Sequence, residues 1–111
     1  MKVIYVAGRY RAETDNGVWE NINHARTEAR KLWYKGWAVI CPHMNTAFMG
    51  GDNDELMFIE GDLEIVRRCD AIYMLDGAHL SLGATEELKL AIELGLKKYF
   101  ECEGVPNAPD N

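Results

Sequence analysis

The sequence predicts an α/β fold in which helices cover both faces of a parallel sheet. Short runs rich in β-branched and aromatic residues alternate along the chain with longer segments whose apolar residues recur at helical spacing. Strands that alternate with helices in this way form parallel sheets through right-handed crossover connections. Parallel sheets bind ligands at the carboxyl ends of their strands, so the residues that follow each predicted strand are the first candidates for a functional site.

The first part of the chain contains two predicted strands and one predicted helix. The run VIYVA predicts a buried strand over residues 3–7. Asp15 or Asn16 is predicted to cap a helix that ends at Gly36. The run WAVIC predicts a second strand over residues 37–41. The apolar residues at helical spacing are Val18, Ile22, Ala25, Ala29, Leu32 and Trp33.

The second part of the chain repeats this alternation. Residues 43–54, which contain two glycines, are predicted to form a loop before a helix over residues 54–68. A strand over residues 70–75, a helix over residues 84–94 and a strand over residues 97–102 follow. The apolar stripe of the first of these helices contains Leu56, Ile59, Leu63 and Val66. The packed side of the second contains Ala84, Leu88, Ala91 and Ile92.

Length and composition fit one small folded domain. The chain has 111 residues, of which 48% are hydrophobic, and we expect a single domain with a loosely ordered tail from about residue 103. Its net charge of −6 argues against a general surface for nucleic acid or for anionic membranes. No apolar run approaches the roughly 18 residues that are needed to span a bilayer.

The cysteines indicate a reducing compartment. Cys41, Cys69 and Cys102 are odd in number and far apart, which predicts free thiols in a cytoplasmic protein and no disulfide framework. His43 follows Cys41 by two residues, but no second pair of ligands has the spacing of a metal site. We therefore expect neither a metal ion nor another cofactor.

Two carboxylates are predicted to lie against apolar neighbours. On a projection of the last predicted helix, Glu87 falls between Ala91 and Leu94, whereas Glu86 faces solvent. Asp62 falls at the same angle beside the apolar stripe of its own helix. A partly desolvated carboxylate costs free energy unless it is paired, so two of them at one cleft indicate a working site. The helix dipole, which favours acidic residues in a first turn, is an alternative explanation for Glu87.

Other polar residues near the strand ends have two explanations each. Tyr5 lies within the first predicted strand, where a tyrosine most often packs in the core. Arg9 and Arg11 follow that strand and are either solvated or bind an anion, which guanidinium groups suit. Ser81 either caps the last helix or binds a phosphate at its N-terminus.

Four segments also carry a family resemblance in their order along the chain: IYVAGRYR, ICPHMNTAF, EGDLEIVRRCDAIYML and SLGATEELKLAIELG. They resemble the nucleoside 2-deoxyribosyltransferase superfamily, in particular its small bacterial and phage branch. The resemblance implies a flavodoxin-like (Rossmann-like) sheet, a homodimer or larger homo-oligomer, and cleavage of an N-glycosidic bond by a glutamate nucleophile. Glu87 matches that nucleophile, Asp62 matches the assisting aspartate, and Tyr5 matches the tyrosine of the first strand.

The resemblance extends to the substrate. Relatives that hydrolyse nucleoside 5′-monophosphates carry a serine six residues before the nucleophile, where it helps to bind phosphate, and Ser81 has that position. We therefore expect a nucleoside or its 5′-monophosphate as substrate, with water or a second base as acceptor. The alternative is a module that binds or senses a nucleotide without processing it. The expected substrate-binding residues are Gly8, Arg9, Arg11, His43, Asn45, Ser81 and Gly83.

Overall fold

The described residues form a four-stranded parallel sheet between helices, which confirms the predicted fold class. The computed structural model describes residues 1–46, 49 and 55–109, so most of the predicted loop over residues 43–54 lies outside the described residues. The strand order is β2-β1-β3-β4. The strands are β1 (Val3–Ala7), β2 (Ala38–Ile40), β3 (Ala71–Met74) and β4 (Lys97–Phe100). The helices are α1 (Asp15–Tyr34), α2 (Pro42–Asn45), α3 (Glu55–Arg67) and α4 (Leu82–Glu93), with 3₁₀ turns η1 (Ala78–Leu80) and η2 (Glu101–Glu103).

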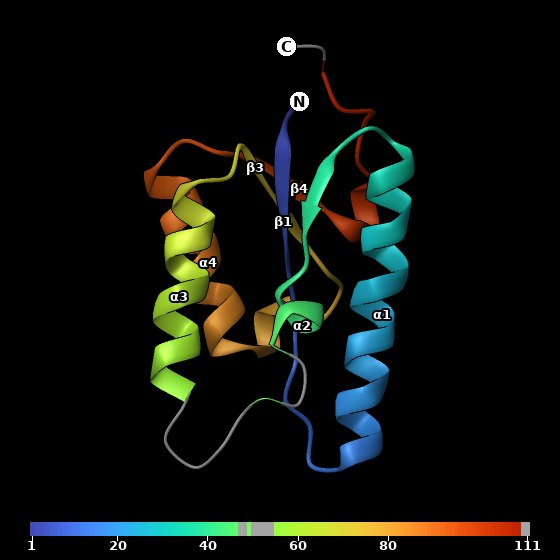
Figure 1. Ribbon diagram of the computed structural model, residues 1–111, viewed down its shortest axis with the longest axis vertical. Coiled ribbons are helices and arrows are strands. Elements are labelled where there is room, and N and C mark those ends of the chain that lie inside the picture. Colours follow the sequence, from blue (N-terminus) through green and yellow to red (C-terminus); the bar gives the residue numbers. More distant parts are fainter. Residues whose placement is uncertain (47–48, 50–54, 110–111) are drawn as a thin grey trace.

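The helices cover the sheet from two sides. Figure 1 shows α1 on one side of the sheet and α3 with α4 on the other. Because side chains alternate along a strand, Ile4 and Val6 of β1 enter the core beneath α1, whereas Tyr5 and Ala7 enter the core beneath α3 and α4. Both faces of the sheet are therefore buried, as parallel sheets require. No helix among the described residues is long and apolar enough to cross a membrane.

The ends of α1 are set by local chemistry. The N-cap is Thr14, so the prediction of Asp15 or Asn16 as the cap was wrong. The Thr14 hydroxyl oxygen accepts a hydrogen bond from the Gly17 N–H at 3.0 Å. Asp15 instead occupies the first turn, where its charge complements the helix dipole. After the helix, Gly36 adopts a φ of +91°, a backbone conformation that glycine adopts readily. The predicted end of this helix at Gly36 is thereby confirmed.

Three residues that the helical patterns place on packed stripes are exposed. Trp33 near the end of α1 is 55% exposed, Leu56 near the start of α3 is 65% exposed, and Ile92 near the end of α4 is 54% exposed. These three predictions were wrong because a projection treats a helix as covered along its whole length. With five residues in β1 and four in β3, the strands are shorter than the helices that lie over them, so residues near the helix ends have less to pack against.

The C-terminal segment packs beside α1, although composition predicts a loose tail. Val105 is buried in the core on the α1 side, and the Trp37 indole N–H donates to the Pro106 carbonyl at 3.1 Å. The Ala108 N–H donates to the Lys35 carbonyl at 2.8 Å, and Lys35 Nζ donates to the Val105 carbonyl at 2.9 Å. These contacts hold the segment against the C-terminal end of α1 and the turn that leads to β2.

Gly8→Ala is expected to destabilise the fold. A β-carbon at Gly8 would lie 2.5 Å from Leu75 Cδ1 and 2.9 Å from Leu75 Cβ. Leu75 is buried, so the added methyl group forces a shift that costs about 1–3 kcal/mol. Urea unfolding followed by circular dichroism measures the change. The control is Gly83→Ala, because a β-carbon there meets nothing closer than Ser81 Oγ at 3.9 Å. Equal unfolding midpoints for Gly8→Ala and the unmodified protein would contradict this explanation.

Candidate active site

The three predicted catalytic residues meet on the side of the sheet that α3 and α4 cover. Tyr5 comes from β1, Asp62 from α3 and Glu87 from α4. The Tyr5 O–H donates a hydrogen bond to Glu87 Oε2, and the charge of Asp62 acts on both side chains. Tyr5 is fully buried and Glu87 is 9% exposed, which confirms the burial that the helical projection predicts for Glu87. The strand tyrosine is thus both a core residue and a partner of the buried carboxylate.

Burial changes the ionisation of all three side chains. It raises the pKa of Glu87 to about 8, since the lost solvation and the nearby Asp62 charge outweigh the Tyr5 hydrogen bond. Burial also raises the pKa of Asp62 to about 6. Burial, with Glu87 next in effect, raises the pKa of Tyr5 far above its usual value, so its O–H remains a donor at neutral pH. Near neutral pH the two carboxylates together therefore hold about one proton.

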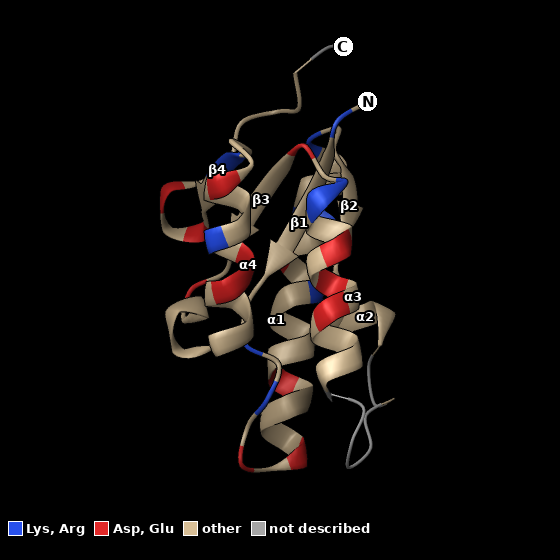
Figure 2. Ribbon diagram, turned by 90° about the vertical axis from the view of Figure 1, so that its left-hand side faces the viewer, with Lys and Arg blue, Asp and Glu red and all other residues tan. Residues whose placement is uncertain are grey.

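The loop after β1 lies beside the segment that leads from β3 to α4. Gly77 in that segment has a φ of +83°, and a β-carbon on it would lie 3.7 Å from Arg9 Cδ. Arg11 is exposed in the same loop as Arg9. Figure 2 shows basic residues of this loop next to the lower end of α4, while acidic residues lie along the outer sides of α3 and α4. The structure thus brings Arg9 close to Gly77, in the segment that leads into α4.

Ser81 is the N-cap of α4. Its Oγ accepts a hydrogen bond from the Ala84 N–H at 3.2 Å, so the hydroxyl proton is left to donate to another group. Gly83 leaves open space next to this hydroxyl, because the nearest atom to a β-carbon there is Ser81 Oγ itself at 3.9 Å. The N-terminus of α4 also carries the positive end of the helix dipole. Helix capping and anion binding by Ser81 are therefore compatible.

His43 of α2 is buried and contacts the loop after β1. It is 4% exposed, and because a carbonyl can only accept, its Nε2–H donates to the Arg9 carbonyl at 2.7 Å. Nδ1 then carries the lone pair, and it has no hydrogen-bond partner among the described residues. Burial lowers the pKa of His43, which favours the neutral ring. In this structure the side chain of His43 holds the Arg9 backbone.

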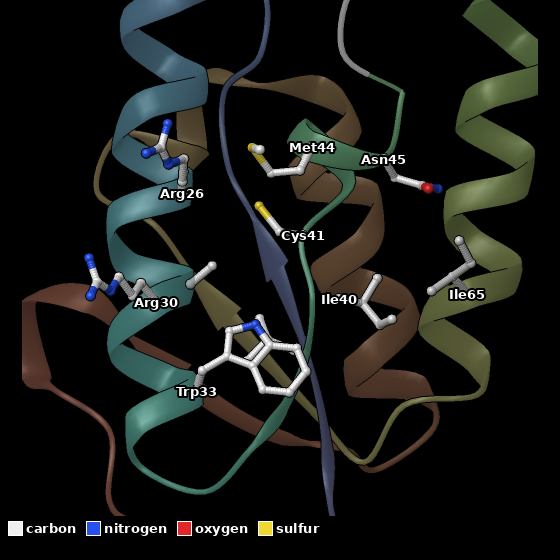
Figure 3. A pocket seen from close by; sticks show the side chains of 10 residues that line it. Arg26, Arg30, Trp33, Ile40, Cys41, Met44, Asn45 and Ile65 are labelled. Atoms are coloured by element: carbon white, nitrogen blue, oxygen red, sulfur yellow. The ribbon is translucent and has the colours of Figure 1, made fainter.

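Asn45 is the last residue of α2. It borders a groove of about 520 Å³ that follows the outer edge of β2 between α1 and α3 (Figure 3). The side chains that line this groove come from α1, β2, α2 and α3, and they do not include Tyr5, Asp62 or Glu87. Asn45 therefore lines a different hollow from the predicted catalytic residues.

Comparison with known proteins agrees with this architecture. The sequence model of a family described as "Domain of unknown function (DUF4406)" matches residues 2–100, from β1 through β4. The chain belongs to this family. A comparison with curated proteins found no match.

A solved structure places the DUF4406 chain within a known fold. A 2-deoxyribosyltransferase from the psychrotolerant bacterium Bacillus psychrosaccharolyticus superposes with a TM-score of 0.68. The two are 22% identical, and the match covers 88% of this chain and 70% of that chain. At this identity the likeness shows the fold alone, and it confirms the flavodoxin-like parallel sheet.

The DUF4406 chain also contains a polar cluster that sequence analysis missed, which we call the α1-side cluster (His24, Glu28, Lys31, Tyr73 and Glu101). Buried Glu28 accepts hydrogen bonds from the Tyr73 O–H at 2.9 Å and from Lys31 Nζ at 2.7 Å. His24 Nε2 lies 2.8 Å from Glu101 Oε1. The position of Glu28 on the apolar stripe of its helix is a signal for burial. No local pattern indicates that Glu28 pairs with Tyr73 of β3. The same is true of the contact between His24 of α1 and Glu101, which follows β4.

Proposed function

We propose that the chain cleaves the N-glycosidic bond of a nucleoside 5′-monophosphate, with Glu87 as the nucleophile. The main support is the buried hydrogen bond between Tyr5 and Glu87 in the presence of the Asp62 charge. Among the described residues no cation contributes to the pKa of Glu87, so its burial costs stability. Folds retain costly groups of this kind mainly where chemistry uses them. The resemblance to deoxyribosyltransferases indicates that this chemistry is the cleavage of an N-glycosidic bond.

In the first step, ionised Glu87 attacks the anomeric carbon of the sugar. A bond forms between a Glu87 carboxylate oxygen and C1′, and the electron pair of the C1′–N bond leaves with the base. Asp62 donates a proton to the departing base, and the Tyr5 O–H keeps the Glu87 carboxylate oriented. The reactive state holds one proton, on Asp62. Because the pKa of Glu87 (about 8) is higher than that of Asp62 (about 6), this state is the minor form of the singly protonated pair, and the proton moves from Glu87 to Asp62 before the attack.

In the second step, an acceptor displaces Glu87 from the sugar. Asp62, which the first step leaves ionised, takes a proton from the acceptor as the acceptor attacks C1′. Water as acceptor gives a sugar 5-phosphate, and a nitrogen of a second base gives a new nucleotide. Hydrolysis and transfer thus share the first step and differ only in the acceptor.

The phosphate end of the substrate is assigned to the start of α4. The Ser81 hydroxyl has a proton to donate, and the helix N-terminus favours an anion. Gly83 leaves space beside this hydroxyl, and Arg9 lies close to Gly77 in the preceding segment. Guanidinium groups bind phosphate well, which makes Arg9 and Arg11 the natural counter-charges in an otherwise acidic chain.

The proposal includes a homodimer or larger homo-oligomer, as the family resemblance implies, in the cytoplasm, as the free cysteines indicate. Trp33 and Tyr34 of α1 are 55% and 79% exposed. These exposed aromatic side chains support the proposal, because a second copy would bury them.

Chromatography tests the proposed reaction. The protein is incubated separately with each common ribonucleoside and deoxyribonucleoside and with each 5′-monophosphate, with and without a second base. We expect free base, or a new nucleotide, from at least one 5′-monophosphate. Thermal stabilisation by a nucleotide without base release or exchange would reject the proposal and identify a binding module.

Ser81→Asp is expected to raise KM for the 5′-monophosphate by roughly tenfold or more, because a carboxylate repels phosphate. Aspartate is a good N-cap, so the helix start should survive the change. The measurement is the ratio of kcat/KM for the monophosphate to kcat/KM for the unphosphorylated nucleoside. Ser81→Asn, a neutral cap, is the control. An equal loss on both substrates would contradict the assignment of the phosphate to Ser81.

A further inference from the structure

Glu101 joins three parts of the chain behind the candidate site. It follows β4, and its Oε1 accepts a hydrogen bond from the Asp76 N–H at 2.9 Å. Its two carboxylate oxygens also lie 2.8 and 3.0 Å from His24 Nε2 on α1. The Glu101 side chain is 18% exposed, so these contacts are partly shielded from solvent. None of the three residues belongs to the Tyr5–Glu87 arrangement described above.

The segment that Glu101 contacts carries Ser81. From Asp76 the chain passes through left-handed Gly77 and the η1 turn to Ser81. The backbone N–H groups of Ala78, Leu80 and Ser81 each donate to the carbonyl three residues earlier, so these hydrogen bonds set the shape of the segment. They do not fix its position relative to β4 or α1. The Asp76–Glu101 hydrogen bond supplies such a connection.

The charge of Glu101 strengthens this connection. Burial raises the pKa of Glu101, but the hydrogen bonds from the Asp76 N–H and from His24 outweigh that effect and hold the pKa below its usual value. Glu101 is therefore ionised at neutral pH, and hydrogen bonds to an ionised acceptor are stronger than neutral ones. The Glu101 charge also contributes to the raised pKa values of Lys31 and Tyr73 in the α1-side cluster, after the larger effects of Glu28 on Lys31 and of burial on Tyr73.

We propose that Glu101 is a positioning residue, which holds residues 76–81 so that Ser81 meets the phosphate of the substrate. This inference rests on the proposed function. Glu101 contacts His24 of α1 and the Asp76 N–H, whereas Glu87 contacts Tyr5 on the side of the sheet that α4 covers, so Glu101 is not placed at the reacting atoms. Its loss should therefore weaken substrate binding and leave the chemical step nearly intact.

Backbone amide hydrogen exchange tests the structural part without any substrate. In Glu101→Ala, the amides of residues 76–81 should exchange faster, whereas those of β1 and β3 keep their protection. Glu101→Gln should restore most of the protection, because its amide oxygen can accept from the Asp76 N–H. Glu103→Ala, which removes an exposed carboxylate two residues away, is the matched control. Unchanged exchange of residues 76–81 in Glu101→Ala would overturn the proposal.

Steady-state kinetics test the functional part. KM for the 5′-monophosphate should rise roughly tenfold in Glu101→Ala, with kcat within about twofold, and Glu101→Gln should restore it. KM for the unphosphorylated nucleoside should not change. Faster exchange with an unchanged monophosphate KM would overturn the role in substrate binding. If the unmodified protein turns over no substrate, the proposed function fails, and the exchange experiment still decides whether Glu101 holds the segment.

Discussion

Glu87→Gln is expected to abolish base release, with a loss of roughly 10⁴-fold or more in turnover. An amide cannot supply the carboxylate oxygen that attacks C1′, and no neighbouring group takes its place in the proposed mechanism. The substitution conserves volume, and its amide oxygen can still accept from the Tyr5 O–H, so the fold should persist. Glu86→Gln is the matched control, because Glu86 lies one residue away and pairs on the surface with Lys89 at 3.3 Å.

The same variant should become the more stable protein as pH rises. Burial raises the folded-state pKa of Glu87 from 4.5 to about 8, so between these values the folded protein binds more protons at this site than the unfolded chain. The buried carboxylate therefore costs stability increasingly as pH rises through this range, and glutamine removes that cost. Thermal unfolding of both proteins at about pH 5 and about pH 8 measures the difference. Retained activity, or a difference in Tm that does not grow with pH, would contradict the assignment.

Asp62→Asn is expected to lower kcat/KM by about 10²–10⁴-fold and to change its pH dependence. In the unmodified protein, activity needs one proton on the carboxylate pair, so the profile should be bell-shaped with limbs near about 6 and about 8. Asparagine removes the proton donor, so the alkaline limb should disappear. The remaining activity should rise with pH as Glu87 ionises. Its midpoint should lie below that of Glu87 in the unmodified protein, because the Asp62 charge raises the pKa of Glu87.

A substrate whose base leaves without protonation distinguishes proton donation by Asp62 from a purely structural role of this residue. The base of an N7-methylated purine nucleotide carries a positive charge and leaves without protonation. Asp62→Asn should therefore retain most of its activity on this substrate while it loses activity on the parent nucleotide. Equal losses on the two substrates, or a bell-shaped profile that persists in the variant, would show that Asp62 is not the proton donor.

Local patterns were sufficient to predict the sheet and the buried carboxylate. Strand runs such as VIYVA and helical spacing depend on neighbouring residues only, so the order of elements follows from them. The burial of Glu87 was predictable for the same reason, since it lies next to the packed stripe of its own helix. The left-handed glycine after the first helix was predictable from the residue type.

Contacts between distant residues were not predictable from such patterns. Tyr5 and Glu87 lie 82 residues apart, and their hydrogen bond depends on how α4 sits over β1. The tie between Asp76 and Glu101 depends in the same way on how the end of β4 meets the segment after β3. Leu56 was misplaced because helical spacing carries no information about the length of the sheet beneath. Tertiary packing decides these features, and the family resemblance contributed Tyr5 as a site residue.

The most direct test of the account is mass spectrometry of the protein after reaction with a 2′-deoxy-2′-fluoroarabinosyl nucleoside 5′-monophosphate. Fluorine at C2′ withdraws electron density from the anomeric carbon and slows release of the sugar from the nucleophile. We expect an adduct with the mass of the fluorinated sugar phosphate on the peptide that contains Glu87, and no adduct in Glu87→Gln. Base release from the natural substrate with an adduct on another residue, or base release that persists in Glu87→Gln, would contradict it.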